Sequence, residues 1–255
     1  MARDQLMEET VYRQFHELED YHFWFKGRRR IFFRLLEDFV FAGKENPLIL
    51  EIGCGAGGFL GPLQEYGRVI GLDIAHEWMK VCAGRGCDGL FTASGYALPF
   101  RDETIDVVCL FDTIEHIPDD RQVLREVRRV LRPGGRLFIS VPAYQFLYSQ
   151  NDRVARHIRR YTRGQLQRKL VEAELEPLKL TYFNAFLLPL ILPALLIKKA
   201  KEWLISPPDD QTTNLTHRFI PPVNYTFERI FSAETPLLRR IDFPFGHSLI
   251  GIAGK

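Results

Sequence analysis

A glycine-dense turn after a short apolar run constrains the fold of this chain more than any other stretch. The run Leu48–Ile52 is apolar apart from Glu51, and glycines follow at positions 53, 55, 57 and 58. A short apolar run bounded by glycines predicts a buried parallel strand. The glycines let the backbone turn sharply and approach a ligand, and the next helix directs its free N–H groups at that ligand. We therefore expect an α/β fold with a ligand site at the end of this strand.

An acid at the end of a second apolar run indicates that the ligand contains a nucleoside. The run Val69–Leu72 ends at Asp73, fifteen residues after Gly58. A carboxylate at that distance is well placed to accept hydrogen bonds from the two hydroxyl groups of a ribose. The type of cofactor stays open on these residues alone, because Gly53, Gly55 and Gly58 also satisfy the G-x-G-x-x-G pattern of dinucleotide-binding domains.

Further segments distinguish the two interpretations. The acid and glycines at 51, 53, 55 and 57 resemble motif I of class I S-adenosylmethionine-dependent methyltransferases. Three later segments resemble, in order, that family's run into the fourth strand, the loop after it, and the helix, turn and fifth strand that follow: Leu98–Val108, Ile114–Asp119 and Glu126–Ile139. The resemblance covers residues 46–143 most closely. It implies S-adenosylmethionine as the cofactor, S-adenosylhomocysteine as its product, and methyl transfer by in-line displacement.

The resemblance also implies which residues contact the cofactor. The glycine loop would shape the methionine end, and Asp73 with Ile74 would hold the ribose and border the adenine. Related sequences tend to carry an acid just before Leu-Pro-Phe that bonds the adenine amino group, whereas Thr92–Ala97 contains none, so Ser94 or a backbone carbonyl is expected to substitute. The complete predicted set is Trp24, Arg28, Glu51, Gly53, Cys54, Gly55, Gly57, Asp73, Ile74, Ser94, Gly95, Phe111 and Asp112.

The alternation of apolar runs and amphipathic segments predicts a Rossmann-like, seven-stranded, mostly parallel sheet sandwiched by helices. Strands are expected at 48–52, 68–73, 89–92, 105–110, 136–141, 177–182 and 247–253, and helices at 57–66, 75–84, 119–131 and 162–174. We divide this single domain into a helical leader or lid (1–45), a cofactor-binding core (46–182), an apolar insertion (183–246) and a last strand (247–255).

The insertion begins with an apolar segment, residues 182–199, that two prolines interrupt. A bilayer span needs about 20 uninterrupted apolar residues, so a spanning helix is not expected. One interpretation is a lid over an apolar substrate pocket. The other is a segment in a membrane interface, with Lys198, Lys199, Lys201 and Trp203 at its rim. The acid-free basic stretch 153–169 would then face anionic lipid headgroups or a substrate phosphate.

Histidines are the expected catalytic groups, because an oxygen or nitrogen nucleophile benefits from a general base near neutral pH. The candidates are His116, His157 and Tyr144. No metal site is expected, since the four cysteines lack the paired spacing of zinc ligands. Scattered cysteines and a charged N-terminus without an apolar signal region predict a cytoplasmic protein, or one peripheral to the inner face of a membrane.

We therefore expect methyl transfer to a small acceptor that is lipophilic or linked to a lipid or sugar. The leader and the segment Arg159–Thr162 resemble bacterial methyltransferases of cell-surface polysaccharide or lipid pathways. One alternative is an RNA methyltransferase, which the formal net charge of +2 and the lack of an added RNA-binding module disfavour. A non-catalytic domain with a degenerate cofactor site is another. An NAD-dependent oxidoreductase is disfavoured because no second nucleotide-binding half is apparent.

Overall fold

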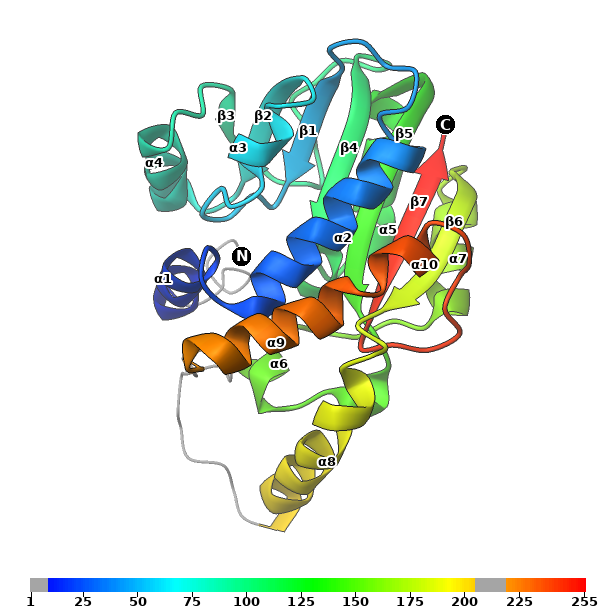
Figure 1. The fold of residues 1–255 in the computed structure, drawn as a ribbon. Coiled ribbons are helices and arrows are strands. Elements are labelled where there is room, and N and C mark those ends of the chain that lie inside the picture. Colours follow the sequence, from blue (N-terminus) through cyan, green and yellow to red (C-terminus); the bar gives the residue numbers. More distant parts are fainter. Residues whose placement is uncertain (1–8, 205–218) are drawn as a thin grey trace.

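A twisted seven-stranded sheet lies at the centre of the computed structural model, which describes residues 9–204 and 219–255 (Figure 1). The sheet order is β3-β2-β1-β4-β5-β7-β6, and β7 runs antiparallel to both of its neighbours while the other pairs are parallel. The strands are β1 (Leu48–Ile52), β2 (Arg68–Asp73), β3 (Leu90–Thr92), β4 (Ile105–Phe111), β5 (Leu131–Pro142), β6 (Glu176–Phe183) and β7 (Ser248–Gly254). The predicted Rossmann-like, mostly parallel sheet is confirmed.

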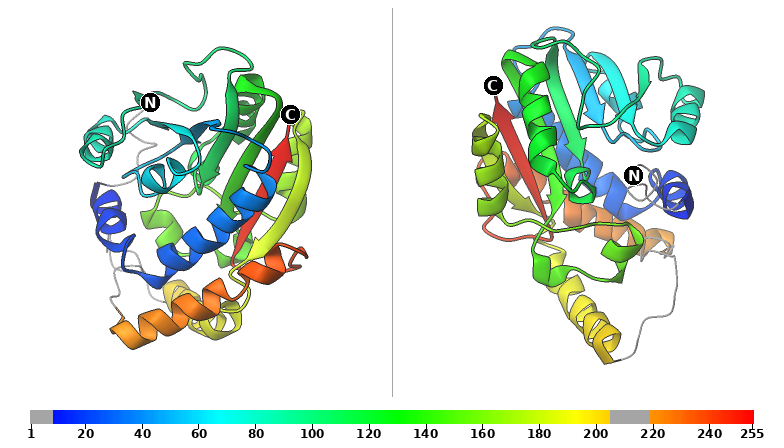
Figure 2. Two further views of the ribbon diagram at one scale, coloured as in Figure 1. Left: turned by 45° about the horizontal axis from the view of Figure 1, so that its top comes forward. Right: turned by 180° about the vertical axis from the view of Figure 1, so that it is seen from behind.

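Helices cover both faces of this sheet (Figure 2). The helices of the described residues are α1 (Glu9–Leu18), α2 (Phe23–Phe39), α3 (Leu60–Leu63), α4 (His76–Gly84), α5 (Asp120–Val130), α6 (Gln150–Val154), α7 (Arg163–Glu172), α8 (Leu188–Leu204), α9 (Pro221–Ser232) and α10 (Thr235–Leu238). The helix predicted at 57–66 is shorter in the structure, where only the four residues of α3 are helical. Three glycines and Pro62 interrupt that stretch, and both residue types are poor in helix interiors.

Two predicted helices show how sequence sets their ends and faces. In α5 the apolar stripe Leu124, Val127 and Val130 is fully buried, and the Asp119 side chain accepts a hydrogen bond from the Gln122 backbone N–H. At the start of α7 the predicted capping box forms. The Thr162 side chain accepts a hydrogen bond from the Gln165 backbone N–H, and the Gln165 side chain accepts one from the Thr162 backbone N–H. Amphipathic periodicity and caps therefore locate both helices.

The helical leader is part of the hydrophobic core. One face of α2 is completely buried against the sheet through Ile31, Phe32, Leu35 and Leu36. The ring of Phe32 packs against those of Phe111 on β4 and Phe138 on β5. Cutting the chain after the leader would expose this surface, so the leader cannot be regarded as a lid alone.

The insertion divides into two parts with different surroundings. Helix α8 extends away from the sheet, whereas α9 and α10 return to pack along α2 (Figure 1). A Cβ on Gly27 would lie 2.6 Å from the Phe231 ring, so the close approach of α2 and α9 requires glycine there. Lys26 and Arg30 pair with the buried Glu228 of α9. Among the described helices, none has both the length and the apolar character needed to cross a membrane.

Candidate functional site

The glycine loop after β1 is fixed by the acid at the end of β2. One Asp73 carboxylate oxygen accepts a hydrogen bond from the Gly55 N–H at 2.9 Å, and the other accepts from the Ala75 N–H at 2.9 Å. Gly53 has φ +76°, and a Cβ on it would lie 2.5 Å from the Thr113 methyl carbon. Only glycine fits this turn without displacing the loop after β4.

Glu51 places an unsatisfied carboxylate oxygen beside the loop. The residue is 2% exposed, and its Oε2 has no hydrogen-bond partner. Burial raises the pKa of this carboxyl group well above its usual range, and the charge of Arg28 partly opposes that shift. A buried carboxylate without a donor fits a ligand ammonium group, such as that of the methionine end of S-adenosylmethionine.

Two adjoining cavities meet at the loop, with volumes of about 260 and 100 Å³. The smaller contains the predicted adenosine-end residues: Asp73, Ile74, Ser94 and Gly95. Both cavities are lined by Gly53, Gly55, Asp112 and His116. The Ser94 hydroxyl accepts a hydrogen bond from the Tyr96 N–H at 3.2 Å, so it stabilises a local turn within the cavity wall.

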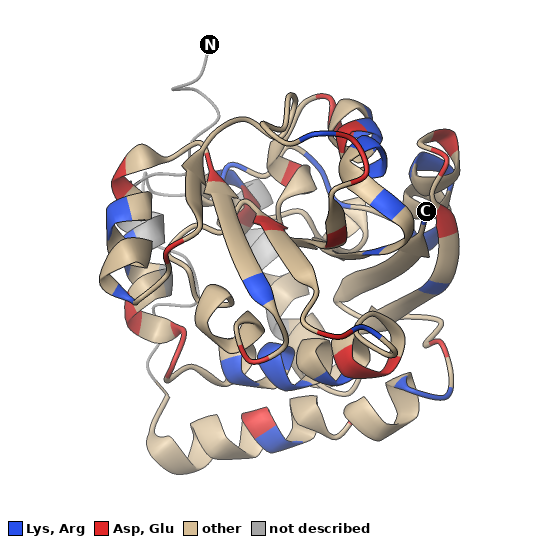
Figure 3. Cartoon of the chain, turned by 90° about the horizontal axis from the view of Figure 1, so that it is seen from above, with Lys and Arg blue, Asp and Glu red and all other residues tan. Residues whose placement is uncertain are grey.

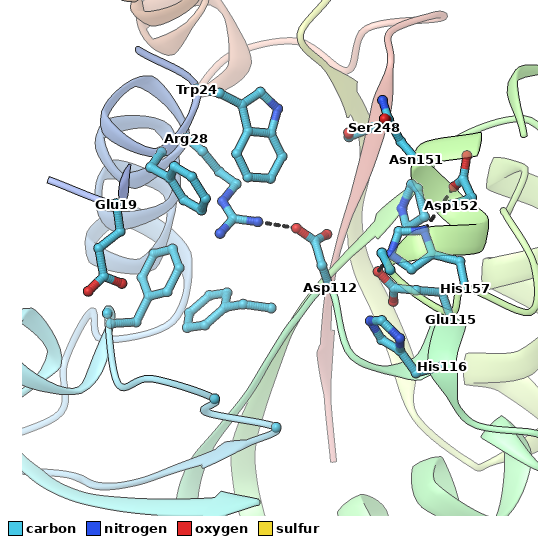
Figure 4. Close-up of a pocket in the computed structure, with 18 of the residues that line it drawn as sticks. Glu19, Trp24, Arg28, Asp112, Glu115, His116, Asn151, Asp152, His157 and Ser248 are labelled. Atoms are coloured by element: carbon cyan, nitrogen blue, oxygen red, sulfur yellow. Dashed lines mark hydrogen bonds and ion pairs between the residues drawn. The ribbon is translucent and has the colours of Figure 1, made fainter. Parts of the chain in front are cut away.

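An arginine from the leader enters the larger cavity (Figure 4). The Arg28 guanidinium donates to the Asp112 carboxylate and lies 4.1 Å from the centre of the Trp24 ring. Burial lowers the pKa of Arg28, and the facing Asp112 charge opposes that effect. Asp112 also accepts a hydrogen bond from the Ser140 hydroxyl at 2.9 Å. Because the Arg28 Nε has no partner, the guanidinium retains a donor for a further anionic group.

The opposite wall of this cavity carries the two predicted catalytic histidines (Figure 4). The His116 and His157 ring centroids lie 4.7 Å apart, with the rings nearly perpendicular. Asp152 lies 2.8 Å from His157 Nδ1, and Glu115 lies 4.0 Å from His157 Nε2. Desolvation lowers the pKa of His116 to about 3, so its imidazole is neutral near physiological pH.

The structure brings most predicted site residues into these cavities, with two exceptions. Gly57 faces Cys82 of α4, whose sulfur would lie 2.9 Å from a Cβ added there. Tyr144 stacks on Tyr182 of β6 at 5.0 Å between ring centroids and lines neither cavity. Its φ of +58° turns the chain sharply after β5, a local feature that apolar periodicity does not reveal.

Several lining residues were not predicted. They come from the residue just after α1, from α6 and the segments on either side of it, from α8, and from the residues where β7 begins: Glu19, Ser149, Asn151, Asp152, Arg160, Leu195, His247 and Ser248. The sequence does contain one indication of this region. Ser149 and Asp152 have the spacing of a capping box, which predicts a helix start there, and they form one in the structure.

The basic stretch 153–169 is partly neutralised within the protein. Arg160 donates to both carboxylate oxygens of Asp152, and Arg159 and Lys169 both pair with the buried Asp120. Acidic and basic residues are interspersed in the view of Figure 3. The side chains of Lys198, Lys199, Lys201 and Trp203 lie outside the described part of the structure.

Comparisons with known proteins point to one domain type. Residues 50–139 match a family model described as a methyltransferase domain. A demethylmenaquinone methyltransferase of Lactiplantibacillus plantarum is 36% identical over 103 residues, covering 36% of this chain and 44% of that protein. An Arabidopsis thaliana tRNA (carboxymethyluridine(34)-5-O)-methyltransferase is 34% identical over 97 residues, covering 37% of this chain and 24% of that protein. The chain thus spans less than half the length of these relatives.

Solved structures match the fold over most of the chain. A SAM-dependent methyltransferase from Archaeoglobus fulgidus aligns with a TM-score of 0.56 and 18% identity, covering 90% of this chain and 92% of that chain. The [4+2]-cyclase SpnF aligns with a TM-score of 0.57 and 16% identity, covering 90% of this chain and 80% of that chain. At such low identity the likeness establishes the architecture, and the chemistry must be argued from the site.

Proposed function

We propose that this chain is a class I S-adenosylmethionine-dependent methyltransferase, because residues 50–139 match a methyltransferase domain, and that it transfers a methyl group to a small lipophilic or lipid- or sugar-linked acceptor. One observation carries the proposal. A cavity lined by Asp73 adjoins a larger cavity lined by Glu51, Arg28 and two histidines, and the glycine loop lines both. This arrangement suits a cofactor that extends from one cavity into the other and presents its methyl group to an acceptor.

The protein's own residues have distinct roles in this proposal. Asp73 would accept hydrogen bonds from the ribose hydroxyls, while Glu51 and Arg28 would hold the ammonium and carboxylate groups of the methionine end. When bound, S-adenosylmethionine supplies an activated methyl group, so the chain's main contribution is alignment and exclusion of water. His116 and His157 would act on the acceptor, since they line the wall that faces the leader.

Helix α8 supports a lipophilic acceptor. Leu195 lines the larger cavity, while Leu190 and Ile197 of the same helix are 60% and 59% exposed. The helix therefore connects an apolar outer surface with the acceptor cavity. The demethylmenaquinone and tRNA methyltransferases match this chain at similar identity, so our proposal of a lipophilic acceptor rests on the apolar surface of α8 and not on these relatives.

The cofactor assignment predicts selective stabilisation of the purified chain. A ligand at about 100 times its dissociation constant stabilises the native state by about 2.7 kcal/mol. For a domain of this size, that corresponds to a midpoint shift of about 5 °C or more. We expect this shift in thermal unfolding with S-adenosylmethionine and S-adenosylhomocysteine, and none with NAD. A shift with NAD alone, or with none of the three, would contradict the assignment.

We also propose that α8 contacts an anionic membrane surface, and vesicle co-sedimentation tests this. The chain should bind vesicles that contain phosphatidylglycerol. The double substitution Leu190→Ser/Ile197→Ser should weaken binding about tenfold or more, because burying one such side chain contributes about 1.5–3 kcal/mol. Val171→Ser removes an equally exposed apolar side chain from α7 and serves as the matched control. Equal binding by the control and the double variant would exclude α8 as the contact surface.

A further inference from the structure

Three side chains with metal-binding chemistry gather at the acceptor end of the larger cavity. They are Glu115 and His116 from the 3-10 turn after β4, and His157 from the segment after α6 (Figure 4). One ligand atom from each lies within 4.8 Å of the other two. Two imidazoles and one carboxylate form a donor set that zinc and similar divalent ions prefer.

Glu115 supplies an independent reason to expect a cation. Its exposure is 0%, and neither carboxylate oxygen has a hydrogen-bond partner. A buried carboxylate that lacks a donor or a counter-ion is unfavourable. The two nearby arginines do not meet this need, because Arg28 pairs with Asp112 and Arg160 pairs with Asp152.

The backbone holds the two ligand-bearing segments together. The Ile158 N–H donates to the Glu115 carbonyl oxygen at 2.8 Å, and the Arg159 guanidinium donates to the Pro118 carbonyl oxygen at 2.8 Å. These bonds fix His157 against the turn that carries Glu115 and His116. The site is therefore held in place before any ligand arrives.

Asp152 orients His157 for coordination. Its carboxylate lies 2.8 Å from His157 Nδ1, which leaves Nε2 directed towards Glu115 at 4.0 Å. Asp152 is itself held by the Ser149 N–H at 2.8 Å and by Arg160. A carboxylate on the second ring nitrogen is the usual support of a metal-binding histidine. Ligand atoms around a tetrahedral zinc ion lie about 3.4 Å apart, given bonds of about 2.0–2.1 Å, so small side-chain rotations would close the site.

We propose that Glu115, His116 and His157 bind one divalent metal ion, with zinc the best match to the donor set, and that its open position binds a hydroxyl group of the acceptor. The acceptor part rests on the proposed methyl transfer. A bound cation lowers the pKa of such a hydroxyl, which then loses its proton to solvent. The oxygen attacks the methyl carbon, the carbon–sulfur bond breaks with its electron pair passing to sulfur, and S-adenosylhomocysteine leaves.

Metal binding can be measured without turnover. The full chain, stripped with a chelator, is titrated with Zn²⁺ against a chromophoric competitor. We expect one equivalent to bind. Glu115→Gln and His157→Gln should weaken binding at least 100-fold, and Asp152→Asn about 10–100-fold through loss of the orienting carboxylate. His76→Gln, which changes an exposed histidine of α4, should leave binding unchanged.

Absence of Zn²⁺ binding by the unaltered chain would overturn this proposal. Equal binding by the unaltered chain and the Glu115→Gln and His157→Gln variants would overturn it as well. Stabilisation by S-adenosylhomocysteine in metal-free buffer checks that each variant is folded and tests the cofactor site separately. If that stabilisation fails in the unaltered chain, the proposed function fails, whereas the zinc titration still decides the metal site.

Discussion

Replacing Asp73 with asparagine is expected to weaken binding of S-adenosylhomocysteine about 100-fold or more. The carboxylate would accept two charge-assisted hydrogen bonds from the ribose, each contributing about 1.5–3 kcal/mol. An amide offers one acceptor oxygen and no charge. That oxygen can accept from only one of the Gly55 and Ala75 N–H groups, and the amide NH2 then faces the other, so loosening of the loop adds to the loss of affinity. Isothermal titration calorimetry measures the change in affinity.

The matched control for this substitution is Asp88→Asn. Asp88 is exposed and lies just before β3, so the variant makes the same chemical change outside both cavities. Its affinity for S-adenosylhomocysteine should equal that of the unaltered chain. If Asp73→Asn also retains full affinity, the smaller cavity is not the ribose site. The proposed orientation, with the methionine end of the cofactor in the larger cavity, would then be wrong as well.

Replacing Arg28 with methionine is expected to lower the free energy of unfolding by about 3 kcal/mol, because removing one partner of a buried ion pair leaves the other charge uncompensated. The affected charge is Asp112, whose φ of +53° already places it in a less favourable backbone region. Urea denaturation measures the change. Arg29→Met removes the neighbouring exposed pair with Asp20 and should cost less than about 1 kcal/mol.

A second substitution separates stability from ligand binding at Arg28. The double variant Arg28→Met/Asp112→Asn removes both charges and should recover more than half of the lost free energy of unfolding. Both Arg28→Met and the double variant should bind S-adenosylhomocysteine more weakly than the unaltered chain, because both lack the proposed contact to the methionine carboxylate. Recovery of both quantities would show that Arg28 acts only through Asp112.

The part of the site where we propose that the cofactor binds has positions that local sequence determines. Short apolar runs fix the parallel strands, and the residues that follow each run must then meet at the same edge of the sheet. Glu51, Asp73 and Asp112 all lie there, as predicted. These positions follow from the pattern of strands without knowledge of any long-range side-chain contact.

The acceptor side was less predictable because it depends on contacts between distant segments. His116 and His157 were both candidates, but their proximity arises from hydrogen bonds that join residues 115–118 to residues 158–159. A search for metal sites that considers only cysteine spacing misses Glu115. This residue is significant because its buried carboxylate oxygens have no hydrogen-bond partner, which only the structure reveals. The stacking of Tyr144 on Tyr182 likewise depends on a strand that follows about 30 residues later.

The position of β7 has a consequence for the order in which the molecule can assemble during synthesis. Strand β6 lies at the sheet edge, and among the described strands it pairs with β7 alone, which comes after it by more than 60 residues. While the ribosome is still producing the intervening residues, the hydrogen-bonding groups of β6 face no strand of this sheet. An unpaired strand can associate with other nascent chains. Completion of the sheet must therefore wait until residues 248–254 have left the ribosome.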